Sequence, residues 1–255
     1  MTRRALVIDV GNTRLKWGLF ADGNLARTGS VLREKLESEG MASFARRLPR
    51  KVQDVMVSNV AGAAFASRLA GVIGMHCECD VHFARSTKQA FGVTNAYRQP
   101  RRLGVDRWVA MIGARSKLRG ALCVVDAGTA VTIDALDGKG RHLGGQIIPG
   151  LELMARSLAS ETSDIGPAST RAGNPPSGIG LFSDSTRKAV RAGAINAVCG
   201  AVDRSVRVLR AAGYRPRVVL TGGDASRILS LLDGKVLHRP HLVLEGLAFM
   251  LQGSR

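Results

Sequence analysis

The sequence has no apolar run that reaches the roughly 20 residues needed to span a bilayer. It also has no small-residue cleavage site after its first residues, which pass directly into an apolar segment that carries Asp9. The first absence argues against a membrane protein, and the second argues against an exported one. We therefore expect a cytoplasmic protein without a membrane partner.

Cysteine is scarce as well. The four cysteines, Cys77, Cys79, Cys123 and Cys199, are too few and too scattered to form the disulfide scaffold of a small secreted domain. Residues 77–79 contain two of them, but a structural zinc site would need a second pair of ligands. The five histidines show no ligand spacing either. We expect reduced, partly buried thiols and no zinc.

Acidic residues are in the minority, and aromatic residues make up only 4% of the chain. Lys and Arg number 37 against 20 Asp and Glu, which gives a net charge of +17. Such a field attracts nucleotides, nucleic acids and acidic metabolites alike. The basic residues are spread along the chain, however, without an aromatic stripe on which bases would stack and without a helix-turn-helix. The charge therefore favours anion binding but no specific nucleic acid.

The sequence does contain an internal repeat. Leu6–Thr13 and Cys123–Ala130 each consist of an apolar β-type run, then Asp-x-Gly, then a small hydroxyl or amide residue. Asp126 follows Asp9 at an offset of 117 residues (126 minus 9). Each copy continues into a second strand-like run. The pattern predicts a strand, a tight turn and a strand, used twice.

The repeated turn suits phosphate binding. Gly11 and Gly128 let the backbone approach a phosphate and present N–H groups to it. A carboxylate at the end of each strand would repel phosphate, so we expect Asp9 and Asp126 to hold a cation or its water shell instead. The alternative is a pair of ordinary β-hairpins. Two matching copies, each opening one half of the chain, favour a nucleoside triphosphate held from both sides.

The remaining pattern fits two α/β halves. We place the boundary at 119–120, which gives domains of residues 1–119 and 120–255. Besides the two hairpins, we predict strands at 55–60, 81–84, 143–148 and 217–221, and helices at 61–73, 104–117, 151–158, 184–212 and 241–251. Residues 160–180, rich in Ser, Gly and Pro, are predicted to form a long loop. Gly222-Gly223, after an apolar strand, offers a flat surface for a nucleotide base or forms an ordinary turn.

Taken together, the motifs resemble those of type III pantothenate kinases. The resemblance covers essentially the whole chain, and the motifs stand in the family's order. They are Asp9–Lys16 and Asp126–Ala130, similar to two phosphate-binding signatures; Gly104–Arg107, similar to the substrate motif; Gly144–Gly150, similar to a glycine-rich segment; Tyr97, at the family's spacing before Gly104; and Ser185-Thr186, similar to a threonine site. Val105 departs from the alanine that often stands there, which concerns packing.

The resemblance implies a fold class and an activity. The fold class would be α/β, a duplicated actin-like (ribonuclease H-like) fold of two similar domains with a central cleft. The activity would be the ATP-dependent phosphorylation of pantothenate to 4'-phosphopantothenate, the first step of coenzyme A biosynthesis. Magnesium would accompany ATP, together with potassium or ammonium. The resemblance further implies a homodimer whose interface completes the substrate site.

The family's site residues carry over to matching positions in this chain. Asp106 would be the general base, Asp9 would orient hydrated magnesium, and Asp126 would hold the monovalent cation. The residues implied in ATP binding are Asp9, Gly11, Asn12, Thr13, Lys16, Thr129, Gly222 and Gly223. Those implied in pantothenate binding are Tyr97, Gly104, Val105, Asp106, Arg107 and Thr186.

Local chemistry leaves plainer alternatives for several of these residues. Asp106 begins a predicted helix and would serve there as a capping residue, with Arg107 in a surface ion pair. Lys16 would be a solvated strand residue, and Tyr97 a half-buried loop anchor. Two other functions also stay open. One is another small-molecule kinase of the same fold, and the other is a non-catalytic basic protein that binds nucleic acid or acts as a regulatory accessory factor.

Overall fold

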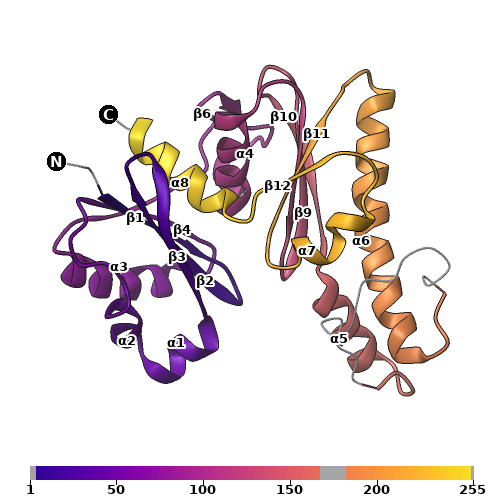
Figure 1. The fold of residues 1–255 in the computed structure, drawn as a ribbon, viewed down its shortest axis with the longest axis horizontal. Helices are drawn as coiled ribbons and strands as arrows, with labels where there is room; N and C mark the ends of the chain where they lie inside the picture. Colours follow the sequence, from indigo (N-terminus) through magenta and orange to yellow (C-terminus); the bar gives the residue numbers. More distant parts are fainter. Residues whose placement is uncertain (1–3, 167–181, 254–255) are drawn as a thin grey trace. The chain divides into compact units, whose positions relative to one another are not determined.

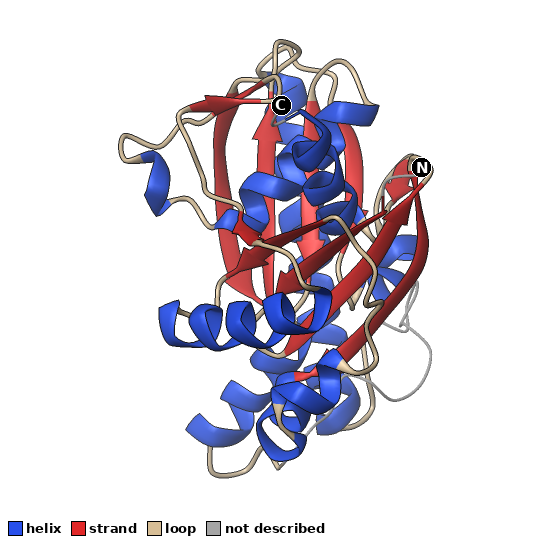
Figure 2. Cartoon of the chain, turned by 90° about the vertical axis from the view of Figure 1, so that its left-hand side faces the viewer, coloured by secondary structure: helices blue, strands red, loops and turns tan. Residues whose placement is uncertain are grey.

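The computed structural model describes residues 4–166 and 182–253 (Figure 1). The chain forms two compact units, one made of Met1–Leu118 with His241–Arg255 and the other of Arg119–Pro240. Each unit contains one five-stranded mixed sheet with helices against its faces (Figure 2). This arrangement confirms the predicted α/β class.

The sheet of the first unit has the strand order β3-β2-β1-β4-β5. Strand β2 pairs antiparallel with both β1 and β3, whereas β4 pairs parallel with both β1 and β5. The strands are β1 (Arg4–Val10), β2 (Arg14–Ala21), β3 (Asn24–Leu32), β4 (Asp54–Asn59) and β5 (Val81–Phe83). A separate small hairpin consists of β6 (Gln89–Ala90) and β7 (Val93–Thr94).

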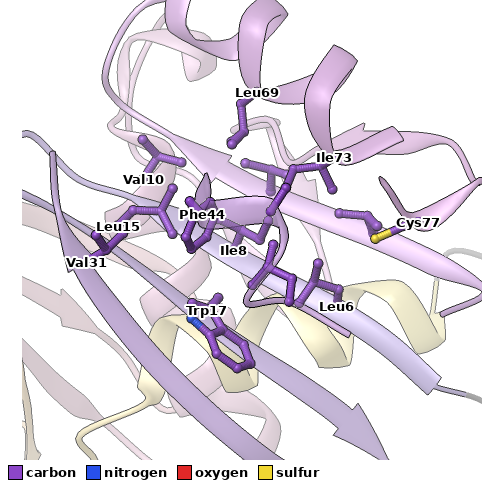
Figure 3. Close-up of a cluster of buried hydrophobic side chains, with 14 of the residues drawn as sticks. Leu6, Ile8, Val10, Leu15, Trp17, Val31, Phe44, Leu69, Ile73 and Cys77 are labelled. Carbon is purple, nitrogen blue, oxygen red and sulfur yellow. The ribbon is translucent and has the colours of Figure 1, made fainter. Parts of the chain in front are cut away.

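Helices cover both faces of this sheet. They are α1 (Arg33–Glu39), α2 (Met41–Ala45), α3 (Ala63–Cys77), α4 (Val105–Lys117) and α8 (Leu242–Gly253), with a 3₁₀ turn η1 (Pro100–Arg102) before α4. Successive strand residues point to opposite faces. Leu6 and Ile8 of β1 pack with Leu69 and Ile73 of α3 in one apolar core (Figure 3). The intervening Val7 lies on the other face, against which α8 packs.

The second unit repeats the arrangement of strands. Its sheet has the order β10-β9-β8-β11-β12, with β9 antiparallel to β8 and β10 and with β11 parallel to β8 and β12. The strands are β8 (Leu122–Ala127), β9 (Ala130–Leu136), β10 (His142–Pro149), β11 (Arg217–Thr221) and β12 (Val236–His238). The helices are α5 (Leu151–Glu161), α6 (Thr186–Ala211) and α7 (Ala225–Ile228), followed by the 3₁₀ turn η3 (Leu229–Leu231). The same succession of strand directions in both sheets agrees with the repeat in the sequence.

The last helix lies in a different unit from the one expected. The predicted domain of residues 120–255 includes it, whereas α8 packs on β1, β2, β4 and α4 of the first unit. Two glycines explain this close packing. Gly113 of α4 lies against Gly246 of α8, and a Cβ on Gly246 would overlap the carbonyl oxygen of Val109. No local pattern in the sequence reports such a long-range contact.

Several elements arise where none was predicted. β3, α1 and α2 occupy residues 24–45. Of the predicted loop at 160–180, the first two residues extend α5, and residues 167–180 lie outside the described residues. Within residues 4–166 and 182–253, none of the helices combines the length and the apolar character that a membrane span requires.

The four cysteines carry free thiols, and three of them are buried. Burial raises the pKa of Cys123 to about 12, and the charge of Asp134 adds to the shift. Burial, with a further effect of Asp203, raises the pKa of Cys199 to about 11. These two thiols therefore stay protonated in the folded protein and pack as small apolar groups.

Candidate active site

The first Asp-x-Gly turn joins β1 to β2. Asp9 is the penultimate residue of β1, and the backbone N–H of Gly11 closes the turn with a hydrogen bond of 3.0 Å. Asn12 and Thr13, at the tip, are exposed. Lys16 lies directly across the antiparallel pair from Asp9. The hairpin thus brings all five predicted residues together at one end of the sheet.

Arg33, at the start of α1, supports this turn and was not predicted from the sequence. Its backbone N–H donates to the carbonyl oxygen of Thr13 at 2.9 Å, and its Nη1 donates to that of Asn12 at 3.2 Å. Its guanidinium carbon lies 4.9 Å from the ring centroid of Phe65, within the range of a cation–π contact. A positive charge is therefore held beside the exposed tip. In the sequence Arg33 is one of many scattered basic residues, which is why no pattern singled it out.

The second Asp-x-Gly turn joins β8 to β9 and is one residue shorter. Val10 pairs with Leu15 across the first turn, and Ala127 pairs with Val131 across the second. The offset of 117 residues therefore relates the two motifs as far as Gly11 and Gly128. The strand that follows the second turn begins one residue earlier than this offset predicts. Asp126 is again the penultimate residue of its strand. The carboxylates of the two copies thus occupy equivalent places in their own sheets.

Two glycines from distant segments of the second unit pack against its turn. Gly150, which precedes α5, donates its N–H to the carbonyl oxygen of Thr129 at 2.9 Å, and a Cβ on Gly150 would overlap the carbonyl oxygen of Gly128. Gly222 has a φ of +102°, and a Cβ there would overlap the backbone of Ala127. Neither position admits a side chain. The second hairpin therefore lies beside both the start of α5 and the Gly-Gly turn after β11.

A polar cluster follows the Gly-Gly turn. Arg227 of α7 has its Nη1 3.2 Å from Oδ1 of Asp224 and 3.6 Å from Oε1 of Glu152 in α5. The pair with Glu152 ties α7 to α5, whereas the pair with Asp224 is local to the start of α7. The position of a Cβ on Gly223 has no heavy atom within 4 Å, so the backbone there faces open space. Of the predicted base-binding dipeptide, Gly222 packs on the hairpin and Gly223 is open.

The predicted substrate motif forms the start of α4. Gly104 precedes the helix and Val105 is its first residue, which places Asp106 and Arg107 in the first turn. The backbone N–H of Arg107 donates to Oδ1 of Asp106 at 2.8 Å. A Cβ on Gly104 would lie 2.7 Å from the same oxygen, so the glycine leaves room for the carboxylate. The helix N-terminus also favours a negative charge at this position.

Arg107 links α4 to Tyr97. Its Nη1 donates to the phenolic oxygen at 3.1 Å, and its Cζ lies 5.9 Å from the ring centroid. Arg107 is only 5% exposed, so the alternative of a surface ion pair is wrong for this residue. A buried charge requires strong polar partners, and Tyr97 is one of them. The structure therefore brings Tyr97 together with the motif at the start of α4.

Asn95 organises the loop that carries Tyr97, and this role was not predicted from the sequence. Its Oδ1 accepts a hydrogen bond from the backbone N–H of Tyr97 at 2.9 Å. Its Nδ2 donates to the carbonyl oxygens of Thr87 and Pro100, each at 3.2 Å. Asn95 is 1% exposed. One buried amide thus holds three segments of the loop in place.

A cavity of about 530 Å³ opens beside this loop. Its walls are Ser86, Thr87, Lys88 and residues 99–102. Lys88, Arg101 and Arg102 are among these residues, although the surface that lines the cavity is mostly apolar. Asp106 is not among the lining residues, so this cavity does not contain the carboxylate of the substrate motif.

Thr186 belongs to the second unit. It is the first residue of α6 and is exposed, whereas Tyr97, Gly104 and Arg107 belong to the first unit. Thr186 therefore lies in a different unit from the other predicted substrate residues. Its contribution to the same substrate stays a prediction.

The donor groups around the first turn fit magnesium that arrives with a nucleotide. They are carboxylate and hydroxyl oxygens, and magnesium usually keeps several waters while it is bound by one or two carboxylates and by phosphates. Among the described residues, no group of three or more His, Cys, Asp or Glu side chains is placed to hold a metal ion. Ser58, beside Asp9 in the sheet, has a buried Oγ without a hydrogen-bond partner in the described part of the chain. These residues suit a hydrated ion better than a metal held by protein ligands alone.

Comparison with known proteins finds relatives over nearly the whole chain. Residues 5–208 match the family model described as type III pantothenate kinase. A type III pantothenate kinase from Nitrosococcus oceani is 37% identical over 249 residues, which cover 95% of this chain and 92% of that protein.

Solved structures show the same fold at lower identity. A conserved protein assigned to the Baf family of transcriptional activators, from Campylobacter jejuni, matches with a TM-score of 0.61 at 19% identity over 98% of both chains. A protein assigned as an N-acetylmannosamine kinase, from Listeria monocytogenes, matches with a TM-score of 0.52 at 13% identity over 99% of this chain and 100% of that one. At these sequence identities the structural similarity shows only that the chains share a fold, and that fold is actin-like.

Proposed function

The chain belongs to the type III pantothenate kinase family, and from this premise we propose that Asp106 is its general base. The reaction transfers the γ-phosphoryl group of ATP to the primary alcohol of pantothenate and gives 4'-phosphopantothenate, the first step of coenzyme A biosynthesis. The alcohol must lose its proton as its oxygen bonds to phosphorus. The Asp106 carboxylate, bonded to the Arg107 N–H and given space by Gly104, would accept that proton. This geometry at the start of α4 is the observation that carries the proposal.

The residues around Asp106 would bind pantothenate. The guanidinium of Arg107 suits a carboxylate or phosphate oxygen, and the bond to Tyr97 would fix its direction. Gly104 and Val105 would supply backbone surface. Thr186 would add a hydroxyl, in part across the interface of a homodimer. Light scattering on the purified protein tests the homodimer directly.

The two hairpins would bind the phosphates of ATP, each through its own turn. The groups involved would be the side chains of Asn12, Thr13, Lys16 and Thr129 and the backbone around Gly11 and Gly128, whose own N–H groups close the two turns at 3.0 and 3.1 Å. Asp9 would hold a water of hydrated magnesium, and Asp126 would hold potassium or ammonium. When bound, magnesium neutralises charge on the phosphates and helps to orient them. The Gly222-Gly223 turn would support the adenine ring.

A coupled kinase assay with pantothenate, followed by mass analysis of the product, tests the proposal. We expect ATP consumption that depends on pantothenate, a product heavier by one phosphoryl group, and a rate that rises with added potassium. A panel of sugars and other alcohols distinguishes another kinase of the same fold. ATP consumption with one of those substrates and none with pantothenate would contradict the assignment. We expect the reaction in the cytoplasm, where ATP is supplied.

A further inference from the structure

Ser58 lies beside Asp9 on the same face of the first sheet. The two residues are register partners in the parallel pair of β1 and β4, as Asp9 and Lys16 are in the antiparallel pair of β1 and β2. Directly paired residues point to the same face of a sheet. Ile8 and Val57, one position earlier, belong to the core with α3, so Asp9 and Ser58 point to the opposite side. Lys16, Asp9 and Ser58 thus form a row across three strands, next to the phosphate-binding turn.

Ser58 is polar but fully buried. Its exposed fraction is 0%, and its Oγ has no hydrogen-bond partner among the described residues. A buried hydroxyl without a partner destabilises a fold, and an alanine would avoid that cost. A purely structural role therefore does not account for a serine at this position. The position of the Ser58 hydroxyl therefore suits a hydrogen bond to a bound group that is not part of the protein.

The second unit repeats this placement. Strand β11 is the parallel neighbour of β8, as β4 is of β1, and Thr221 is the register partner of Asp126. Thr221 is 2% exposed. A buried hydroxyl residue thus stands beside the Asp-x-Gly aspartate in both sheets. Recurrence at equivalent places favours a role in the shared chemistry of the two turns.

We propose that Ser58 binds the water shell of magnesium–ATP together with Asp9. A serine hydroxyl both donates and accepts hydrogen bonds, so it can hold a water against the Asp9 carboxylate and orient it. Asp9 alone would hold such a water from one side only. The proposal rests on the nucleotide-binding role proposed above for the first hairpin.

The test is the binding of a non-hydrolysable ATP analogue to the Ser58→Ala variant, measured by titration calorimetry with magnesium and again with the metal chelated. Loss of a hydrogen bond in the hydrated-ion site should weaken binding about tenfold with magnesium and leave binding without magnesium unchanged. Equal affinity of variant and wild type with magnesium would overturn the proposal. An equal loss in both conditions would overturn it too.

Two further variants keep the test decisive. Ser58→Cys replaces the hydroxyl by a somewhat larger, weakly hydrogen-bonding thiol and decides the question if Ser58→Ala does not fold; failure of both to fold would overturn the proposal in favour of a structural role. Ser205→Ala is the matched control, because it removes another buried hydroxyl, one that donates to the carbonyl oxygen of Ala201 at 2.7 Å in α6 and accepts from Nε2 of Gln146 at 2.9 Å. It should bind the analogue like the wild type. A similar magnesium-dependent loss in this control would also overturn the proposal.

Pantothenate phosphorylation by the wild-type preparation tests the proposed function separately. If the wild type is active and Ser58→Ala binds magnesium–analogue normally, only the role of Ser58 fails. If the wild type binds the analogue with magnesium but does not phosphorylate pantothenate, the assigned substrate fails. The binding data then still decide the role of Ser58.

Discussion

Nη1 of Arg107 lies 3.1 Å from the phenolic oxygen of Tyr97 and donates a hydrogen bond to it. The bond joins the first turn of α4 to a loop that Asn95 holds through three hydrogen bonds of its side chain. Because Arg107 is 5% exposed, its guanidinium has little freedom to turn toward solvent. Tyr97 therefore anchors its loop and at the same time orients the cation next to Asp106.

We expect Tyr97→Phe to weaken pantothenate binding and to leave ATP binding unchanged. The substitution keeps the ring and removes only the oxygen that accepts from Arg107. Hydrogen bonds to charged groups contribute about 1.5–3 kcal/mol, which corresponds to a rise in the KM for pantothenate of roughly 10- to 100-fold. Steady-state kinetics with each substrate varied in turn measures this. A raised KM for ATP with an unchanged KM for pantothenate would contradict the assignment.

Asp106→Asn should lower kcat by about 10²- to 10⁴-fold, the usual contribution of a general base. The asparagine has nearly the same shape and still accepts a hydrogen bond from the Arg107 N–H, so the melting temperature and ATP binding should stay at wild-type values. Single-turnover rates and calorimetric binding, measured on one preparation, separate these effects. A variant with a near-normal transfer rate would show that the alcohol proton leaves by another route.

The parts of the fold that local patterns encode could be predicted from the sequence. The apolar runs and Asp-x-Gly turns around Asp9 and Asp126 specify both hairpins, because strand and turn chemistry depend on neighbouring residues. Contacts between distant segments could not be predicted in this way. The packing of Gly246 against α4, the bonds of Asn95 and the pairing of Ser58 with Asp9 each depend on tertiary structure that a single sequence does not display.

Asp137 supports the turn between β9 and β10, and its ionisation is linked to stability. Its Oδ1 accepts from the backbone N–H groups of Lys139 and Arg141, each at 2.8 Å, and its Oδ2 accepts from Nε of Arg141 at 2.6 Å. Burial acts to raise the pKa of Asp137, but these hydrogen bonds and the charge of Arg141 together lower it below the ordinary value of 3.8. Because the pKa of Asp137 is lower in the folded state, the ionised carboxylate stabilises the fold at pH values above the unfolded-state pKa. This contribution is lost as the pH falls through the folded-state pKa.

Asp137→Asn should therefore be less stable than the wild type near neutral pH, by about 1 kcal/mol, with the difference closing as the pH falls below 3.8. Urea unfolding of both proteins along a pH series measures the difference. Asp184→Asn is the control, because Asp184 is exposed and its ion pair with Lys188 is screened by solvent. A stability gap for Asp137→Asn that widens on acidification would reverse the assigned sign.

Gly246→Ala tests whether α8 is part of the first unit. A methyl group at Gly246 would overlap the carbonyl oxygen of Val109, so α8 and α4 would have to move apart. Overpacking of this kind costs about 1–3 kcal/mol, and each kcal/mol lowers the melting temperature of a chain of this size by roughly 2–4 °C.

The matched control for Gly246→Ala is Gly200→Ala. Gly200 is an exposed glycine inside α6, and a Cβ there meets no heavy atom within 4 Å. Its replacement should raise stability by up to about 1 kcal/mol, because alanine favours the helix over glycine. Calorimetric melting of the two variants should therefore give shifts of opposite sign. If α8 instead packed without close contact to α4, Gly246→Ala would behave like Gly200→Ala, and the division of the chain at residues 118 and 241 would lose its physical basis.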